Sequence, residues 1–529
     1  MTLLIVGAIG LGARYFLTET DAGKDFANKA GQEQTSGNSG SSATNDSKSD
    51  KGGGLFGNKK SSSSNDSDVI KIGVVTWGGY AGGQYFNEGF KASEQSRFYK
   101  DYGFKVEFKV LDDFEASRDA FRADEVQLLW QTIDAFPTEV NGLGDFDPVI
   151  LWQADWSRGG DAIVAKRGIN RVEDLRGKTI AVAELTPSHS FLIWLLDAGG
   201  LTMKDVKIVA QPSAIDAAEV FKSGNVDAAV VWSPDDILCV EAVKGSRIIK
   251  NSENTNIIAD VFMAKRAFAD ANKDKLRKLY EGWMRGSAEI NSRPAAKQKA
   301  AKILADEFTD LGTSLSVDDA LQMINNVRLT THGDNKNFFG LNTNFDGING
   351  ETLYTEMSKT YKNLGFIEGN VPYWRKIAYP NFVRTTTLTE EMHFAENAKK
   401  FAKPTVNDTK KEAVSTKPVS INFRTGEYKL DANAKNIIDR DFVNIAKAFN
   451  LRIRIEGNTD NVGNHDSNVV LSKKRAQSVV DYLVGEHKMN PNRFVVVGNG
   501  PDKPVSGCER NQNDRCKEKN RRTDFQLID

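Results

Sequence analysis

Three observations predict an α/β protein of more than one domain. Apolar strand patterns alternate with helical patterns between residues 69 and 264, as in domains built on largely parallel sheets. The chain has 529 residues, whereas one domain averages roughly 150. Two linker-like segments, 21–68 and 391–415, divide it. We therefore expect a large α/β domain at 69–390 and a small α+β domain at 416–529.

The expected elements of the large domain follow from their apolar patterns. Each strand is a short apolar or alternating run, and each helix carries one apolar face. The strands are expected at 69–75, 106–110, 179–183, 206–210 and 227–232, with helices at 186–198 and 214–223 and a mostly helical region at 265–364.

The small domain shows the order strand, helix, strand, helix, strand, strand. Its strands are expected at 420–424, 451–457, 493–497 and 523–528, and its helices at 431–449 and 468–486. It carries 20 Lys or Arg against 15 Asp or Glu, so its charge is +5 while the rest of the chain carries −6. This asymmetry weakly favours an acidic polymer as its partner.

Composition and motifs exclude several protein classes. The chain has 70 Lys or Arg and 71 Asp or Glu, a balance that argues against a general nucleic-acid binder. Only one apolar run approaches spanning length, which excludes a polytopic membrane protein. The five histidines are scattered, and no zinc spacing, phosphate loop or nucleophile elbow is present. We expect no metal, no cofactor and no enzymatic activity.

The N-terminal residues 1–20 predict export from the cytoplasm. Leu3 to Ala13 is apolar or glycine, a length that fits a signal peptide or a short membrane anchor. Of the 38 residues from Gly31 to Asp68, 11 are Ser and 7 are Gly, so residues 21–68 are expected to form a disordered tether. A cleaved signal and an anchor both remain open.

The small domain resembles the OmpA-like peptidoglycan-binding family. The motifs T-D-x-x-G at Thr459, N-x-x-L-S-x-x-R-A at Asn468 and N-R-R at Asn520 occur in the family's order and spacing. The resemblance implies that a carboxylate and an arginine grip the zwitterionic end of diaminopimelate in the peptidoglycan stem peptide, which suits a carboxylate and a guanidinium fork. The implied residues are Asp460, Asn468, Arg475, Arg521 and Arg522. An ordinary salt bridge between Asp460 and Arg475 is the alternative.

The same resemblance implies a disulfide. Many OmpA-like domains of exported proteins carry one in the loop that follows Gly500, where this chain has Cys508 and Cys516. Two unpaired thiols are the alternative. Cys239 lies in an apolar stretch and is expected to be a buried thiol.

The large domain resembles the periplasmic substrate-binding proteins of the nitrate, taurine, sulfonate and thiamine-precursor transporter group. The segments that carry the resemblance are 159–166, 172–182, 187–191 and 224–234. The resemblance implies the type 2 periplasmic-binding-protein fold, in which two α/β lobes are joined by crossover strands and hold a ligand between them. The second lobe is expected at about 161–250.

The ligand site is expected at loops between strands and helices, where backbone amides converge. Glycines there let a backbone approach a ligand, and five of the eight tryptophans fall in this region. Core packing, helix capping and solvated turns are the alternative roles. The candidates are Thr76, Trp77, Gly78, Gly79, Asp112, Trp130, Thr132, Thr186, Ser188, His189 and Trp232, with Gly82, Gly83, Asp113 and Asp235 nearby.

Together these features predict a periplasmic solute-binding protein of ABC-transporter type, attached to peptidoglycan by its C-terminal domain. Expected partners are a small organic solute, the peptidoglycan stem peptide and an inner-membrane permease. Carboxylates and aromatic residues in the candidate loops favour an amine-containing or zwitterionic solute over a sulfonate or inorganic anion.

Three other protein classes were weighed. A structural or signalling wall linker would use the binding-protein fold for protein interaction. A stator-type subunit would need an acidic residue in its span, and Leu3 to Leu17 has none. An enzyme acting on a pyrimidine-like substrate lacks a nucleophile and base pair.

Overall fold

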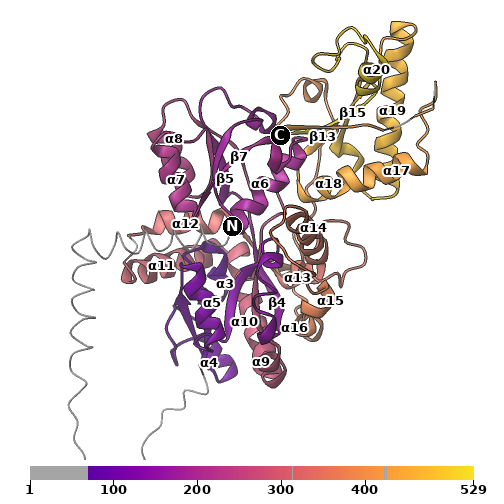
Figure 1. Ribbon diagram of the computed structural model, residues 1–529. Helices are drawn as coiled ribbons and strands as arrows, with labels where there is room; N and C mark the ends of the chain where they lie inside the picture. Colours follow the sequence, from indigo (N-terminus) through magenta and orange to yellow (C-terminus); the bar gives the residue numbers. More distant parts are fainter. Residues whose placement is uncertain (1–68, 313, 422, 425) are drawn as a thin grey trace, which may run out of the picture. The chain divides into compact units, whose positions relative to one another are not determined.

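The computed structural model describes residues 69–529 except positions 313, 422 and 425. The predicted signal or anchor at 1–20 and the predicted tether at 21–68 therefore lie outside the described residues. Within the described ranges, no helix is long and apolar enough to cross a membrane. The α/β class is confirmed (Figure 1), because helices cover two separate sheets in the large domain.

The first sheet has six strands in the order β11-β4-β10-β3-β1-β2. The strands β1, β2 and β3 are parallel, whereas β10 runs antiparallel to both β3 and β4. Their bounds are β1 Val69–Val74, β2 Lys105–Val110, β3 Leu128–Thr132, β4 Pro148–Ser157, β10 Ala259–Lys265 and β11 Val327–Leu329. Every residue of β3 and β4 is buried, so both of their faces are covered.

The second sheet has five strands in the order β7-β6-β8-β5-β9. Alternate residues face two different helix layers: Val230 packs in the same core as α6, while Val231 packs with Phe221 of α7 and Cys239 of α8 (Figure 1). The strands are β5 Asp161–Ala165, β6 Thr179–Ala183, β7 Lys207–Gln211, β8 Ala228–Trp232 and β9 Arg247–Asn251, and the helices are α6 Pro187–Ala198, α7 Ala214–Lys222 and α8 Asp235–Ala242.

The chain passes between the two sheets twice, from β4 to β5 and from β9 to β10. Ser252 joins the two passages, because its Oγ accepts hydrogen bonds from the amides of Gly159 (2.8 Å) and Asp161 (3.2 Å) and lies 2.8 Å from the Oγ of Ser157. All these contacts are buried, so a network of buried hydrogen bonds holds the two passages together at the junction between the sheets.

Helices after β10 complete the large domain. The long helix α10 crosses α3 at glycines: a Cβ added at Gly83 would lie 2.4 Å from Cε3 of Trp283, and one at Gly82 would lie 2.1 Å from the Oγ of Ser287. These glycines therefore permit close helix packing. The helices of this domain not yet given are α3 Ala81–Phe86, α4 Arg97–Tyr102, α5 Phe114–Arg122, α9 Arg266–Ala271, α10 Lys273–Ser292, α11 Pro294–Asp310, α12 Val317–Asn325, α13 His332–Phe338, α14 Gly350–Asn363, α15 Trp374–Ile377 and α16 Asn381–Thr385.

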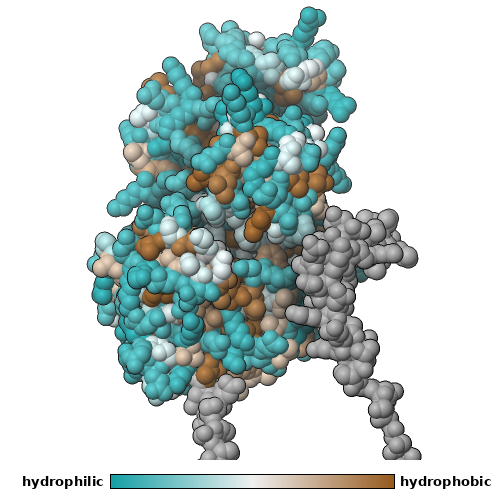
Figure 2. Space-filling view, turned by 90° about the vertical axis from the view of Figure 1, so that its left-hand side faces the viewer, coloured by the Kyte–Doolittle hydropathy of each residue, from teal (hydrophilic) through white to brown (hydrophobic). Residues whose placement is uncertain are grey.

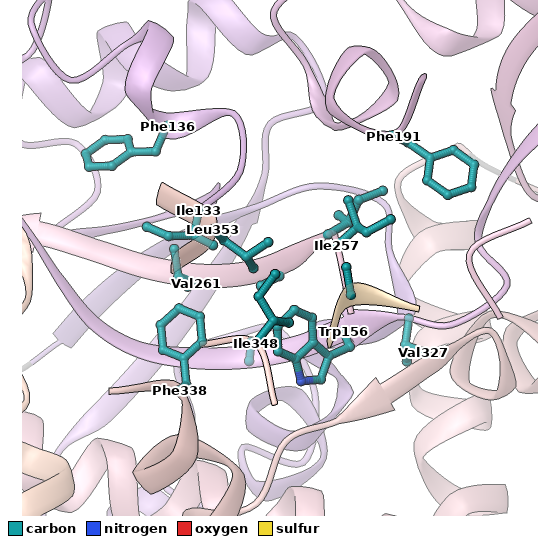
Figure 3. Close-up of a cluster of buried hydrophobic side chains, with 14 of the residues drawn as sticks. Ile133, Phe136, Trp156, Phe191, Ile257, Val261, Val327, Phe338, Ile348 and Leu353 are labelled. Carbon is teal, nitrogen blue, oxygen red and sulfur yellow. The ribbon is translucent and has the colours of Figure 1, made fainter. Parts of the chain in front are cut away.

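The core continues from the first sheet into these helices. Figure 3 shows part of it, where Trp156 of β4, Val261 of β10 and Leu353 of α14 belong to one buried cluster. The outer face in Figure 2 is mostly hydrophilic, with separate apolar patches. Exposed Ile215 of α7 and Ile237 and Leu238 of α8 are isolated apolar residues of the kind common on soluble domains.

The segment expected to be a linker, 391–415, makes specific contacts. The carbonyl of Phe394 accepts a hydrogen bond from the Oγ1 of Thr331 (2.8 Å), and the amide of Glu396 donates to Asp334 (2.6 Å). The carbonyl of Ala402 accepts from Arg452 (3.0 Å). These contacts fix the segment along its length, so it is not a free chain.

The small domain has a four-stranded sheet in the order β12-β15-β13-β14. The strand predicted at 420–424 is wrong, because the first strand is β12, Ser415–Val419, which pairs with β15. The other strands are β13 Arg452–Asn458, β14 Phe494–Gly500 and β15 Thr523–Ile528. The helices are α17 Ala432–Ile438, a π-helical turn at Asp439–Val443, α18 Asn444–Ala448, α19 His465–Gly485 and the unexpected α20 Asp514–Asn520.

Candidate functional site

A small cavity lies where the ends of the two sheets meet. Its walls come from both sheets and from the start of α6. Aromatic and acidic side chains dominate the lining, which consists of Val75, Trp77, Tyr80, Trp130, Thr132, Asp161, Pro187, Trp232, Ile258 and Asp260.

Strand register places three carboxylates at this junction. Asp260 of β10 lies directly opposite Asp155 of β4 on one side and Thr132 of β3 on the other. In the second sheet, Asp161 of β5 lies opposite Trp232 of β8. Partners in register on neighbouring antiparallel strands project to the same face, so each sheet carries its acidic residues to the cavity end.

Each carboxylate accepts a hydrogen bond from a neighbouring side chain. The hydroxyl of Tyr80 donates to Asp260 (2.6 Å), and the indole nitrogen of Trp77 donates to Asp155 (3.0 Å). The hydroxyl of Ser157 donates to Asp161 (2.7 Å). The Oδ1 atoms of Asp155 and Asp161 are buried and accept no hydrogen bond, so each retains an unused acceptor.

Burial changes the ionisation of all three acids. Asp155, Asp161 and Asp260 are 0%, 2% and 5% exposed. Loss of solvation raises the pKa of Asp161 to about 7 and the pKa of Asp260 to about 7. The hydrogen bonds that Ser157 donates to Asp161 and Tyr80 donates to Asp260 lower these pKa values, but burial has the larger effect. Burial and then the charge of Asp260 raise the pKa of Asp155. Asp161 and Asp260 therefore titrate near neutral pH.

Aromatic rings form the remaining wall. The ring of Phe114 lies 5.4 Å from that of Trp130 and 6.3 Å from that of Trp232, so it bridges the two lobes. The indole nitrogen of Trp232 donates to the Oγ of Ser188 at the start of α6 (3.0 Å). A Cβ added at Gly160 would lie 2.1 Å from the ring of Trp77, so glycine is required where this ring covers the crossover.

The structure brings only some of the predicted ligand residues together. Trp77, Trp130, Thr132 and Trp232 line the cavity, and Ser188 adjoins it through Trp232.

The remaining candidates make contacts within the protein. Asp112 accepts hydrogen bonds from the amide (2.7 Å) and hydroxyl (2.8 Å) of Thr76 in an exposed turn. The hydroxyl of Thr186 donates to the carbonyl of Ala183 (2.8 Å).

His189 lies outside the lining. Its Nδ1 accepts from the amide of Leu185 (3.1 Å), and burial lowers its pKa to about 4. It is therefore a neutral, structural side chain at neutral pH.

The two early glycine candidates approach protein atoms. A Cβ at Gly78 would lie 2.5 Å from the carbonyl oxygen of Met323, and one at Gly79 would lie 1.2 Å from Oδ2 of Asp155. Gly79 thus makes room for one of the acids.

Sequence reasoning missed Asp155, Asp161 and Asp260 as site residues. The available signal was an acidic residue inside a fully apolar strand pattern, as in Ala259-Asp260-Val261. Such a residue is rarely buried unless it has a partner.

A second cleft lies in the C-terminal domain. It is lined by Ser420, Ile421, Phe423, Gly457, Asn458, Arg475, Glu518, Arg521, Arg522 and Thr523. Arg475 donates to the carbonyl of Glu427 (3.0 Å), and its guanidinium lies 4.9 Å from the centre of the Phe423 ring. Burial and then the charge of Arg521 lower the pKa of Arg475, while Asp460 raises it.

Three of the predicted wall-binding residues, Arg475, Arg521 and Arg522, line this cleft. Asp460 pairs with Arg521 (2.6 Å), whereas the alternative was a salt bridge to Arg475. Arg522 pairs with Asp524 (2.9 Å) and retains a buried Nη1 without a hydrogen-bond partner. Asn468, in the first turns of α19, donates to the carbonyl of Val462 (3.0 Å). The cleft thus offers guanidinium groups from a helix and from the turn before β15.

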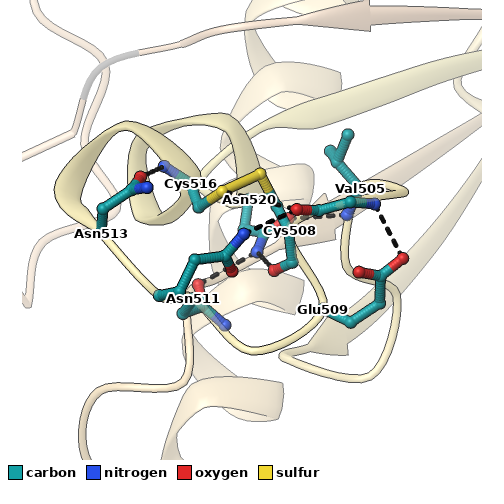
Figure 4. Close-up of a disulfide and its surroundings, with 9 residues drawn as sticks. Val505, Cys508, Glu509, Asn511, Asn513, Cys516 and Asn520 are labelled. Atoms are coloured by element: carbon teal, nitrogen blue, oxygen red, sulfur yellow. Dashed lines mark hydrogen bonds between the residues drawn. A yellow bond between two sulfur atoms is a disulfide. The ribbon is translucent and has the colours of Figure 1, made fainter.

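A disulfide joins Cys508 and Cys516 beside this cleft (Figure 4). Asn520 lies next to it and donates to the carbonyl of Cys508 (2.9 Å), while its own oxygen accepts from the amide of Val505 (2.7 Å). The bridge therefore holds the loop that precedes Arg521 and Arg522.

Two family models match separate parts of the chain. Residues 160–297 match the NMT1/THI5 like family, and residues 422–520 match the OmpA family. The chain joins these two domain types. The NMT1/THI5-like match includes the second sheet and the return through β10, and the OmpA match includes the second cleft.

Curated relatives divide in the same way. The taurine-binding periplasmic protein of Escherichia coli (strain K12) is 27% identical over 192 residues, which are 35% of this chain and 58% of that protein. The peptidoglycan-associated lipoprotein of Rhizobium meliloti (strain 1021) is 35% identical over 89 residues, 17% of this chain and 50% of that protein. The chain thus spans about half the length of these relatives.

Among solved structures, the periplasmic aliphatic sulphonate binding protein of Escherichia coli aligns with 60% of this chain and 99% of its own length, at 17% identity and a TM-score of 0.46.

Proposed function

We propose that this protein is a non-enzymatic solute-binding protein of the cell envelope. Residues 69–390 hold a small organic solute between two lobes, and residues 416–529 attach the protein to peptidoglycan. The observation that carries the proposal is the cavity at the crossover strands, whose aromatic and acidic lining comes from both sheets. Closure of two lobes around such a cavity is the means by which binding proteins enclose a ligand.

The two family matches support the two halves of the proposal. Relatives of the first half are named as taurine- or sulfonate-binding proteins, and a relative of the second half as a peptidoglycan-associated lipoprotein. Both names favour the periplasm as the location. An inner-membrane permease of ABC type is the proposed recipient of the solute, and co-purification with such a permease tests this step.

Wall attachment is proposed to use Asp460 and Arg475, with Arg521, Arg522 and Asn468 around them. The ammonium and carboxylate of a zwitterionic stem-peptide end fit a carboxylate and a guanidinium. Removing either side chain leaves its partner charge unpaired, which costs about 2–5 kcal/mol of binding.

The test is sedimentation of the full chain with purified sacculi. Asp460→Ala and Arg475→Ala should each abolish co-sedimentation, while Arg440→Ala, which changes an exposed arginine paired with Asp441, should bind as wild type. Co-sedimentation of both site variants at the wild-type level would remove the assignment. Solute binding is tested separately by native mass spectrometry of the protein purified without denaturant. Wall binding with no solute would favour the wall-linker alternative.

A further inference from the structure

The cavity at the crossover is lined by acidic side chains and by no basic side chain. Asp161 and Asp260 line it, and Asp155 lies opposite Asp260. None of the ten lining residues, all of which lie in the described range, is Lys or Arg. Arg118 lies 4.9 Å from the centre of the Trp130 ring, but it is already paired with Glu139 (2.7 Å).

When these acids are ionised, their buried and unpaired charges are unfavourable without a ligand. Like charges directly opposite on neighbouring strands destabilise a sheet, and buried charges persist when they are paired. The Oδ1 atoms of Asp155 and Asp161 are buried acceptors that no protein donor occupies. A positively charged donor group bound in the cavity would pair with the buried charges and would also donate to the unoccupied acceptors.

The aromatic lining specifies the kind of donor. Trp77, Tyr80, Trp130 and Trp232 line the same cavity as the acids. Their ring faces attract organic cations, most strongly where water is excluded. A hydrated metal ion gains little from such rings, whereas an alkylated ammonium or a guanidinium interacts with rings and carboxylates together.

We infer that the bound solute is a compact organic cation, whose positively charged nitrogen lies beside Asp161 and Asp260 and the aromatic rings that line the cavity. This inference rests on the proposed solute-binding function and names its ligand class. It differs from the sulfonates in the names of the relatives, because a sulfonate group would lie beside buried carboxylates.

The start of α6 does not offset that repulsion. The amides of His189 (3.0 Å) and Ser190 (3.2 Å) both donate to the carbonyl of Thr186, and the amide of Leu185 donates to His189. The hydroxyl of Ser188 already accepts from Trp232. These three amides are engaged within the protein and are not directed at a bound anion.

Binding of a cation should release protons. The empty site retains protons on its acids near pH 7, and a cation favours their ionised forms, so affinity rises with pH between 6 and 8. Each proton released gives up to about a tenfold change in affinity per pH unit. The other titratable or charged groups around the three acids are Tyr80, Arg118, Asp134 and Asp236.

The experiment compares tetramethylammonium, choline and guanidinium with taurine, ethanesulfonate, nitrate and Ca²⁺, using thermal shift and calorimetry on the full chain. We expect the organic cations to raise Tm and choline to bind more tightly at pH 8 than at pH 6. Calorimetry in buffers of different ionisation enthalpy should register proton release. Asp161→Asn and Asp260→Asn should each weaken choline binding by about thirtyfold or more, because both side chains line the cavity.

The control is Asp145→Asn, which changes an exposed acid that does not line the cavity. It should bind choline within about twofold of wild type, as expected for a site without direct contact. Circular dichroism verifies that each variant is folded.

The outcomes separate the inference from the function on which it rests. Stabilisation by sulfonates or nitrate but not by cations would overturn the cation inference and leave solute binding intact. Stabilisation by Ca²⁺ alone would overturn it in favour of a metal site. Absence of any response from all seven probes would overturn the cation inference, and native mass spectrometry with no bound solute would then also remove the proposed function.

Discussion

Asp161→Asn should remove a pH dependence of folding stability that the wild-type protein carries. Asp161 is 2% exposed, and burial raises its pKa to about 7 from its ordinary value of 3.8. Between these values the folded chain retains a proton that the unfolded chain has released. The free energy of unfolding therefore falls as pH rises through this window and levels off above pH 7.

The size of the effect follows from the window. One proton corresponds to about 1.4 kcal/mol per pH unit, so Asp161 alone lowers stability by about 2–3 kcal/mol between pH 5 and pH 7. Asparagine does not titrate, and its side-chain oxygen still accepts the hydrogen bond from Ser157. The variant should thus match wild type near pH 5 and exceed it at pH 8.

The assay is urea unfolding of ligand-free full chain at pH 5, 6, 7 and 8, followed by tryptophan fluorescence. Asp145→Asn, which changes an exposed acid, should run parallel to wild type. Parallel curves for Asp161→Asn and wild type would refute the reasoning, because they would mean that Asp161 titrates alike in the folded and unfolded chains.

Three further predictions concern packing and the disulfide. Trp283→Ala should lower the unfolding free energy by about 3–5 kcal/mol in urea titrations, since this ring is fully buried, and a loss below 1 kcal/mol would contradict its role in the core. Gly83→Ala should cost about 1–3 kcal/mol in the same assay, because its Cβ would collide with Trp283; an unchanged midpoint would show that α3 and α10 can separate. Cys508→Ser should destabilise the C-terminal domain by about 2–3 kcal/mol, because it removes the disulfide. Wild-type protein that is unfolded without reductant should be alkylated only at Cys239. Alkylation of Cys516 without reductant would argue against the disulfide.

Local patterns predicted the elements whose periodicity is uninterrupted. The strands at Thr179–Ala183 and Thr523–Ile528 were predicted with these bounds. The first strand of the small domain was misplaced, because Pro418 suggested a linker. The strand β12 lies at the edge of its sheet, where a proline is tolerated since one side of the strand needs no partner.

The candidate site was only half predictable for a related reason. Tryptophans such as Trp77 and Trp232 attract notice at the ends of strand patterns, so the aromatic wall could be proposed from the chain alone. The acids Asp155 and Asp260 are 105 residues apart, and only the antiparallel register of β4 and β10 brings them opposite each other. Long-range register is not encoded in a local window, and it decides which buried polar residues meet.

The location of these acids on paired strands has a consequence for how ligand choice can change over time. Loop residues can be exchanged one at a time with little effect on the scaffold. Here Asp155 lies opposite Asp260, so a replacement of Asp155 also changes the surroundings of Asp260. In the same way, a replacement of Asp161 changes the residue that lies opposite Trp232. A shift to another solute class therefore requires coordinated substitutions on several strands, so mutations in this pocket should be strongly epistatic.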